Sequence, residues 1–216
     1  MTAPPVIDRR ARRRQTTKEE ILEAAWTLAR TQGLTEFSLR DLAASIGMRA
    51  PSLYEYFASK NAIYDAMFGQ GMREALAAAT AKSKSRTLRG ALRENAHRMF
   101  DFATVDPART QLLFLRTLPG FEPSPESYAP AVELSARVQR LLVEHGITHP
   151  DAMDLWTALI SGLINQQLAN DPGGQRWGRL IDLAVDMFIA AISPNRPARS
   201  RAKEAHDDAD TGRRDR

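Results

Sequence analysis

The 216-residue chain contains no cysteine. That absence excludes disulfide bonds, thiolate metal sites and thiol redox chemistry, and it fits a reducing compartment. The apolar segment 180–192 is too short to span a bilayer and carries two aspartates. The basic N-terminus is not followed by an apolar stretch, so we expect no signal peptide. These absences predict a soluble cytoplasmic protein that has no membrane partner.

The sequence also lacks the motifs that many enzymes and metal proteins display. His145 and His149 lie on either side of Gly146, so no single helix face presents both as metal ligands. His97 and Asp101 have a spacing more typical of a surface hydrogen bond than of a catalytic pair. No nucleophile elbow, phosphate-binding loop or HExxH sequence is present. We therefore expect no catalysis, no cofactor and no metal site.

No segment longer than a few residues alternates polar and apolar positions as a half-buried strand does. Helical periodicity covers most of the chain and is interrupted by proline and glycine. The pattern predicts an all-α protein of about nine helices. Three short helices come first, and longer ones are expected at roughly 60–82, 86–105, 107–117, 125–145, 151–170 and 175–192.

Basic residues are concentrated at the two ends of the chain, whose formal net charge is +4. Residues 1–60 carry ten Lys/Arg against seven Asp/Glu, whereas residues 61–192 carry thirteen against fourteen. A basic end on a neutral body suits an anionic partner such as DNA. Residues 1–15 are predicted to be a disordered basic arm, either a solvated tail or an arm that contacts phosphates or the minor groove. Residues 193–216 are predicted to be a disordered tail.

Start and stop signals define three helices after this arm. The sequence Thr17-Lys18-Glu19-Glu20 has the capping-box pattern and is expected to begin the first helix, which Gly33 ends. Ser38 is expected to cap a short second helix that Gly47 closes, and Pro51 to open a third helix. Two short helices joined by a glycine-containing turn of this length predict a helix-turn-helix.

The stretch from Thr17 to Met67 resembles the DNA-binding domain of the TetR (tetracycline-repressor) family. The resemblance is carried by Phe37-Ser38-Leu39-Arg40-Asp41-Leu42-Ala43, by Ile46-Gly47-Met48-Arg49-Ala50-Pro51-Ser52-Leu53-Tyr54-Glu55-Tyr56-Phe57 and by Ser59-Lys60. It includes the order and spacing of three helices, which makes it specific. It implies a DNA-binding domain over residues 16–62, and a helical domain over residues 63–192 that binds a ligand and dimerises.

The candidate DNA contacts follow from the resemblance and from the needs of a recognition helix. Such a helix presents polar groups to the groove while its other face anchors it, here through Leu53 and Phe57. Helix N-termini attract phosphate, and Arg49 can reach a guanine edge or a phosphate. The candidate DNA-binding residues are Thr17, Ser38, Arg40, Arg49, Ala50, Pro51, Ser52, Tyr54, Tyr56 and Lys60.

Some of these assignments have a simpler alternative. Tyr56 can be a packing residue, and Thr17 and Ser38 can serve as helix caps alone. Glu55 would repel phosphate unless it faces sideways or accepts from a cytosine amino group. Family members often carry Lys or Gln where Ala50 stands, so neighbouring residues would do more of the base reading here.

The last two predicted helices are the expected dimer interface. Segment 151–170 carries two apolar stripes, and segment 180–192 is apolar nearly all round, as buried helices are. Two such helices from each subunit would form a four-helix interface. The homodimer would set its recognition helices about one DNA turn apart, which requires a palindromic operator in double-stranded DNA. The candidate interface residues are Leu159, Leu163, Leu180, Leu183, Met187, Phe188 and Ala191.

Large side chains spread over the predicted body are candidates for the pocket of a small-molecule effector. They are Met99, Phe100, Phe102, Phe114, Leu115, Phe121, Tyr128 and Trp156, with Asn165 and Gln166 as polar anchors. A mostly apolar pocket with few polar groups is typical of ligand sites, but aromatic residues at helical spacing are equally typical of plain core. The expected mechanism is a shift between conformers, with helix 60–82 as the lever.

The function that these features favour is a bacterial ligand-responsive repressor, associated with the nucleoid when bound to DNA. Two alternatives stay open. A TetR-like activator would have the same sequence features, because the position of the operator relative to the promoter separates the two. A ligand-independent DNA-binding protein would lack a cavity and would bind DNA regardless of metabolites.

Overall fold

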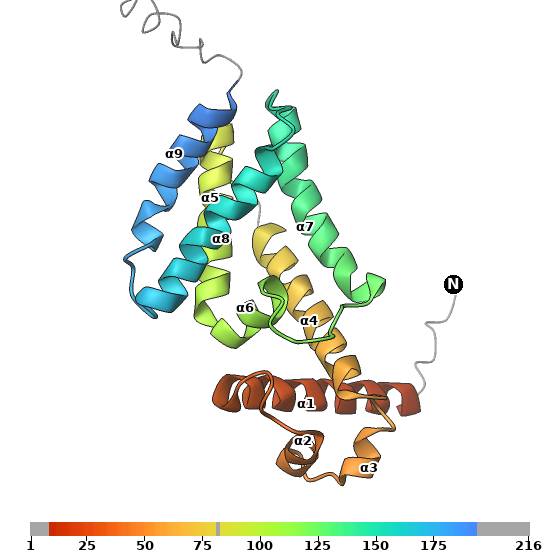
Figure 1. Cartoon of the computed structure of the whole chain (residues 1–216). Coiled ribbons are helices and arrows are strands. Elements are labelled where there is room, and N and C mark those ends of the chain that lie inside the picture. Colours follow the sequence, from red (N-terminus) through yellow and green to blue (C-terminus); the bar gives the residue numbers. More distant parts are fainter. Residues whose placement is uncertain (1–8, 81–82, 194–216) are drawn as a thin grey trace, which may run out of the picture.

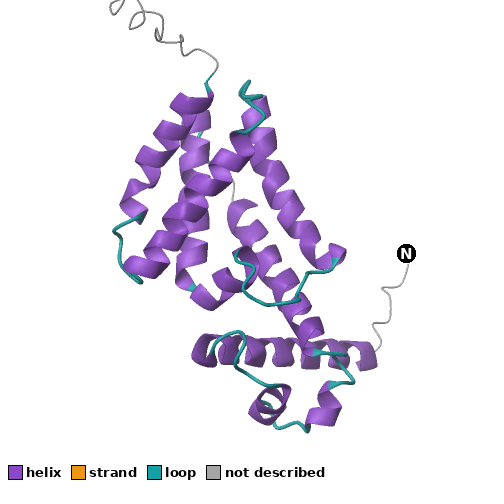
Figure 2. Cartoon of the chain, viewed as in Figure 1, coloured by secondary structure: helices purple, strands orange, loops and turns teal. Residues whose placement is uncertain are grey.

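The computed structural model describes residues 9–80 and 83–193. Within them every regular element is a helix and no strand occurs, which confirms the predicted all-α class (Figure 2). The helices are α1 (Arg9–Gln32), α2 (Leu39–Ser45), α3 (Ala50–Leu53), α4 (Lys60–Thr80), α5 (Leu88–Val105), α6 (Pro107–Phe114), α7 (Pro125–Glu144), α8 (Ala152–Asn170), the 3-10 turn η1 (Gly178–Leu180) and α9 (Ile181–Ile192). Residues 1–8 of the predicted arm and the predicted tail from 194 onward lie outside the described residues.

Most predicted breaks agree with the observed helix ends. Gly33, Gly47 and Gly146 follow α1, α2 and α7 with φ values of +102°, +67° and +75°, a region that favours glycine. Two helix ends in the body were misplaced: the helix expected from residue 175 is α-helical only from Ile181, after the 3-10 turn η1, and the helix expected to reach residue 117 ends at Phe114. The chain is already extended at Leu115, with φ −120° and ψ 131°.

The predicted start of the first helix was wrong. Helix α1 begins at Arg9, so residues 9–15 of the expected disordered arm are helical. The Thr17 hydroxyl donates to the carbonyl of Arg13 at 3.1 Å, as a threonine inside a helix does, and therefore does not cap the helix. Arginine is a good helix former, and this propensity prevails over the local capping pattern.

The helix-turn-helix and the body share a hydrophobic core. In Figure 1, α1 lies across the base of the body, α2 and α3 lie beneath it, and α4 rises from them into the body. One core cluster joins residues of α1–α4 to Leu112 and Leu113 of α6, so it crosses the predicted domain boundary at residue 62. A second cluster lies among α5, α7, α8 and α9. A displacement of α6 would therefore change the packing of the helix-turn-helix part.

Helix α4 approaches its neighbours in the body closely at two glycines. A Cβ atom on Gly71 would lie 3.0 Å from Cδ1 of Leu113, and one on Gly69 would lie 2.9 Å from Oγ of Ser127. Both distances are shorter than ordinary van der Waals contact. Glycine at these positions lets α6 and α7 pack directly against the α4 backbone.

We expect Gly71→Val to lower the free energy of unfolding by about 1–3 kcal/mol, because the added methyl groups overpack the contact with Leu113. Urea unfolding at fixed protein concentration measures this loss. The matched control is Ala77→Val on the exposed side of the same helix, which carries only the small helix-propensity cost of a β-branched residue. Equal losses in the two variants would contradict the close packing at Gly71.

Candidate functional site

Hydrogen bonds define both ends of α2. The Ser38 hydroxyl accepts from the backbone N–H of Asp41 at 3.1 Å, and the Asp41 carboxylate accepts from the Ser38 N–H at 3.0 Å, which completes a capping box. Hydrogen bonds from Ser38 hold the pKa of Asp41 below its ordinary value. At the other end of α2, the Met48 N–H donates to the Ala43 carbonyl at 2.8 Å. The predicted cap at Ser38 is confirmed.

Helix α3 is a single turn whose two sides differ sharply. Leu53 and Phe57 are 1% and 7% exposed and belong to the core cluster that contains Phe37. On the outer side Tyr54 is 55% exposed, and Arg49 and Pro51 are also exposed. The predicted anchors are therefore buried, and the residues expected to meet DNA point away from them. Pro51 is the second residue of α3, not the first as predicted.

The candidate DNA-binding residues fall into two groups. Ser38, Arg40, Arg49, Pro51 and Tyr54 are exposed, whereas Thr17, Ala50, Ser52, Tyr56 and Lys60 are partly buried. The first group can contact a partner molecule without any change in conformation, because its side chains are already exposed.

The ammonium of Lys60 is engaged within the protein. It donates to the Thr35 carbonyl at 3.0 Å and lies 4.6 Å and 5.4 Å from the ring centroids of Phe37 and Tyr64. Desolvation lowers the pKa of Lys60 relative to its ordinary value. The side chain therefore connects the start of α4 to the loop before α2. Because an ammonium has three N–H donors, it can still donate to a further partner.

The first turns of α1 reach the segment after α3, a contact that the sequence reading missed. The guanidinium of Arg14 lies 5.2 Å from the centroid of the Tyr56 ring and donates to the Glu55 carbonyl, and Lys18 lies 5.5 Å from the Phe57 ring. Cations over aromatic faces stabilise such contacts. The packing role considered for Tyr56 is therefore present in the structure.

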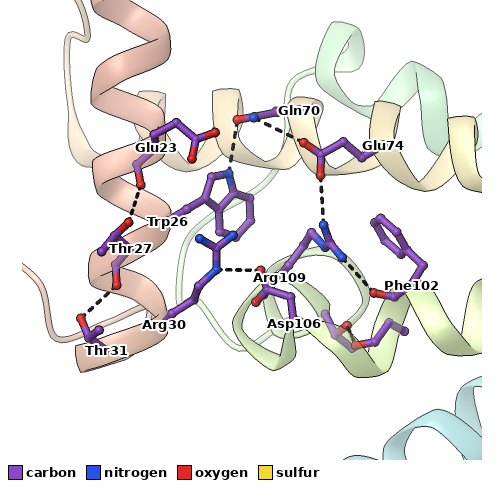
Figure 3. A network of polar contacts seen from close by, with 12 residues as sticks. Glu23, Trp26, Thr27, Arg30, Thr31, Gln70, Glu74, Phe102, Asp106 and Arg109 are labelled. Atoms are coloured by element: carbon purple, nitrogen blue, oxygen red, sulfur yellow. Dashed lines mark hydrogen bonds and ion pairs between the residues drawn. The ribbon is translucent and has the colours of Figure 1, made fainter.

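A polar network joins α1 to the body (Figure 3). The Arg30 guanidinium pairs with the Asp106 carboxylate at 2.8 Å, and the Trp26 indole donates to Gln70 at 3.3 Å. Asp106 is only 6% exposed and also caps α6 by accepting from the Arg109 N–H at 3.0 Å. One carboxylate therefore links α1 of the DNA-binding part to the first turn of α6.

We expect Arg30→Ala to lower the free energy of unfolding by about 1–3 kcal/mol, because it removes the partner of a buried carboxylate. The control is Arg140→Ala, whose ion pair with Glu133 is about half exposed and should contribute about 0–1 kcal/mol. Urea unfolding compares the two, and hydrogen exchange should show faster opening of α1 in the first variant alone. Equal stability losses and equal exchange rates of α1 in the two variants would show that the Arg30–Asp106 pair does not couple α1 to α6.

A cavity of about 330 Å³ lies in the body among α4, α5, α6, α7 and α8. Six of the ten predicted pocket residues line it: Met99, Phe114, Leu115, Tyr128, Trp156 and Asn165. None of its lining residues is charged, and its size is typical of ligand pockets. Three methionines, Met72, Met99 and Met153, give the lining adaptable shape.

The other four predicted pocket residues lie elsewhere. Phe100 is buried in the second core cluster, and Phe121 packs against Tyr64 with ring centroids 5.8 Å apart. Phe102 lies under the Arg109 guanidinium at 3.9 Å. Gln166 is exposed, and its side-chain carbonyl accepts a hydrogen bond from the Asn170 amide. The buried amide is that of its neighbour Gln167, whose side-chain carbonyl accepts from the backbone N–H of Trp177 at 2.9 Å, in the loop before α9. Phe100, Phe102 and Gln166 lie on sides of their helices that do not line the cavity.

Apart from Tyr128 and Asn165, which were predicted, the polar lining residues are the part of the cavity that the sequence did not predict. Thr157, Ser161 and Asn165 of α8 lie at intervals of four residues, beside the buried stripe of Trp156 and Ile160. A polar row of this spacing on an otherwise apolar helix is the signal that could have identified them. Asn95 of α5, Thr110 of α6 and Ser135 of α7 also contribute polar groups to the lining.

The structure divides the apolar surface of α8 and α9 into an inner and an outer side. Trp156, Ile160 and Ile164 of α8 are buried, as are Ile181, Val185, Phe188 and Ile192 of α9. Leu155, Leu183 and Met187 are 41%, 58% and 60% exposed. Of the candidate interface residues, Leu183, Met187 and Ala191 are exposed and Leu159, Leu163 and Leu180 are partly buried. Phe188 belongs instead to the protomer's own core, where its ring lies 5.1 Å from that of Trp156.

Two further tests concern metals and membranes. No group of three or more His, Asp or Glu side chains suited to a metal ion occurs in residues 9–80 and 83–193. Across those same ranges, no helix combines the length and the apolar character needed to cross a bilayer.

The fold and the site together define a helix-turn-helix attached to a larger helical body. Residues 21–67 match the model of the tetR family of bacterial regulatory proteins. This match confirms, over those residues, the resemblance seen in the sequence. No curated protein matches the chain significantly.

Solved structures share the fold over most of the chain. A protein of unknown function from Rhodococcus sp. RHA1 is 18% identical, with a TM-score of 0.70, over 81% of this chain and 94% of its own. A TetR family transcription regulator from Marinobacter aquaeolei VT8 is 20% identical, with a TM-score of 0.64, over 84% and 98%. A variant of TetR from Acinetobacter baumannii AYE, in complex with minocycline, is 20% identical, with a TM-score of 0.59, over 81% and 94%.

Proposed function

We propose that this protein is a sequence-specific DNA-binding repressor that acts as a homodimer and responds to a small molecule. The observation that carries the proposal is the two-sided α3 turn, in which buried Leu53 and Phe57 hold exposed Arg49, Pro51 and Tyr54 outward. A rigid anchor of this kind is what base reading in the major groove requires. Residues 9–14 of α1, which carry five arginines, extend the cationic surface toward phosphates.

The exposed sides of α8 and α9 support dimerisation. They carry exposed Leu155, Leu183 and Met187, the kind of apolar surface that commonly marks an interface. Gly162 lies between Leu159 and Leu163 on the same side of α8, and a Cβ atom there would meet nothing within 4 Å. A second copy related by a twofold axis would cover this surface and place two α3 turns over successive turns of a palindromic operator.

The uncharged cavity supports the effector site. Its lining includes Thr110 and Leu113 of α6, and Asp106, which caps α6, pairs with Arg30 of α1. An effector that favours another position of α6 would therefore shift α1 and α4 with it. The spacing of the two recognition turns would then no longer match the operator, so DNA is released by a population shift.

The test is selection of bound duplexes from a random library by the purified full-length protein at moderate salt. A palindrome with half-sites about 10 base pairs apart is expected, since two-fold symmetry of the dimer is copied in its site. Absence of any enriched duplex over competitor would overturn the proposal. An operator that overlaps a promoter supports repression, whereas one upstream of the promoter would favour the activator alternative.

A further inference from the structure

A second cavity, of about 320 Å³, adjoins the first at the end of the body away from the helix-turn-helix. The two share Asn95, Leu134 and Val138 in their linings. On α4 the first cavity is lined by Met72 and the second by Ala79, seven residues further along. Seven helical residues correspond to about 10 Å of rise, so the two cavities form consecutive chambers along α4, α5 and α7.

The two chambers differ in charge. Among the described residues, the first chamber has no charged lining residue, whereas Arg98 of α5 and Arg137 of α7 line the second. No acidic residue of the described part of the chain lines the second chamber. An elongated molecule that occupies both chambers would therefore have an uncharged body and find positive charge at one end only.

Neither arginine has a close ion pair among the described residues; Arg98 is partly buried and Arg137 is exposed to solvent. The Nε atom of Arg98 is buried and has no hydrogen-bond partner among the described residues. Its ion pair with Glu94 is long, at 3.5 Å, and Glu94 also accepts from the Lys84 N–H at 3.1 Å. Arg137 forms no ion pair within the described part of the chain. The Nε atom of Arg93 on the same α5 helix also lacks a partner, but the other two guanidinium nitrogens of Arg93 pair with two aspartates.

We propose that the effector is an elongated amphipathic carboxylate, with its apolar body in the first chamber and its carboxylate between Arg98 and Arg137. The inference rests on the proposed effector site. Guanidinium forks match carboxylate oxygens in bidentate pairs, and the Asn95 amide stands where the molecule passes from one chamber to the other. A 150 Å³ apolar cavity binds benzene, so the first chamber has room for roughly a dozen carbon atoms.

Calorimetric titration of the full-length protein with the straight-chain acids from octanoate to hexadecanoate tests this assignment. We expect the tightest binding for an acid of about twelve carbons, and at least roughly tenfold weaker binding for the alcohol of the same length, the scale of one lost charge-assisted pair. The double variant Arg98→Gln/Arg137→Gln should bind the acid and the alcohol equally. Arg140→Gln is the matched control, because Arg140 lies one turn beyond Arg137 on α7, pairs with Glu133 and lines neither chamber.

Three results would overturn the assignment: no binding of any acid in the series, equal affinity for acid and alcohol in the unaltered protein, or acid binding that ignores both arginines. Thermal unfolding of the double variant without ligand shows whether its fold is retained, and retained binding of the alcohol shows that the first chamber is intact. DNA binding is measured separately on the selected duplex. If the alcohol binds the protein and releases it from DNA as effectively as the acid does, the proposed function is retained and only the anionic subsite is contradicted.

Discussion

Gly162→Arg should convert the protein from a dimer to a monomer while leaving each protomer folded. The side chain has open space in the protomer, because no atom lies within 4 Å of a Cβ at this position. In the proposed dimer the same position lies on the apolar side of α8 between Leu159 and Leu163, where two arginines would bring unpaired charge into a buried interface. Burying an uncompensated charge costs about 3–5 kcal/mol, which predicts at least a 100-fold weaker dimer.

Sedimentation velocity over a concentration series measures this change, and gel shift should show a parallel loss of operator binding. Gln139→Arg, on the exposed side of α7, adds the same charge outside the proposed interface and should leave the dimer intact. The thermal midpoint of the monomeric variant, compared at high dilution with that of the unaltered protein, separates dissociation from unfolding. A Gly162→Arg variant that remains dimeric would place the interface elsewhere.

The second large effect concerns α3. Replacing Arg49 and Tyr54 together with alanine should weaken operator binding by about 2–6 kcal/mol, because each lost contact contributes about 1–3 kcal/mol. Both side chains are exposed and neither belongs to the core, so the free energy of unfolding should change by less than about 0.5 kcal/mol. Fluorescence anisotropy with the selected duplex, alongside urea unfolding, provides both numbers.

Lys60→Ala is the informative comparison for that double variant. Its ammonium donates to Thr35 and lies over Phe37 and Tyr64, so its removal should cost both operator affinity and stability. Unchanged affinity in the Arg49/Tyr54 double variant would remove the docking geometry proposed for α3. A Lys60 variant that lost stability alone would restrict that residue to a structural role.

Features set by neighbouring residues were predictable without the structure. Ser38 caps α2 because its hydroxyl and Asp41 are three residues apart, a distance that local backbone geometry determines. Gly33 and Gly47 end helices because both adopt positive φ. The same kind of reasoning failed at Thr17. The capping pattern there competed with the helix propensity of the preceding arginines, and the helix propensity prevailed.

Features that depend on how distant helices meet required the structure. Helix α9 is apolar nearly all round, so its composition could not tell the core side of Phe188 from the outer side of Met187. Trp156 lines the cavity and Phe100 is plain core, although both are large aromatic residues on buried helices. The Arg30–Asp106 pair spans 76 positions in sequence. Periodicity specifies which side of a helix is apolar, but only tertiary packing decides what that side meets.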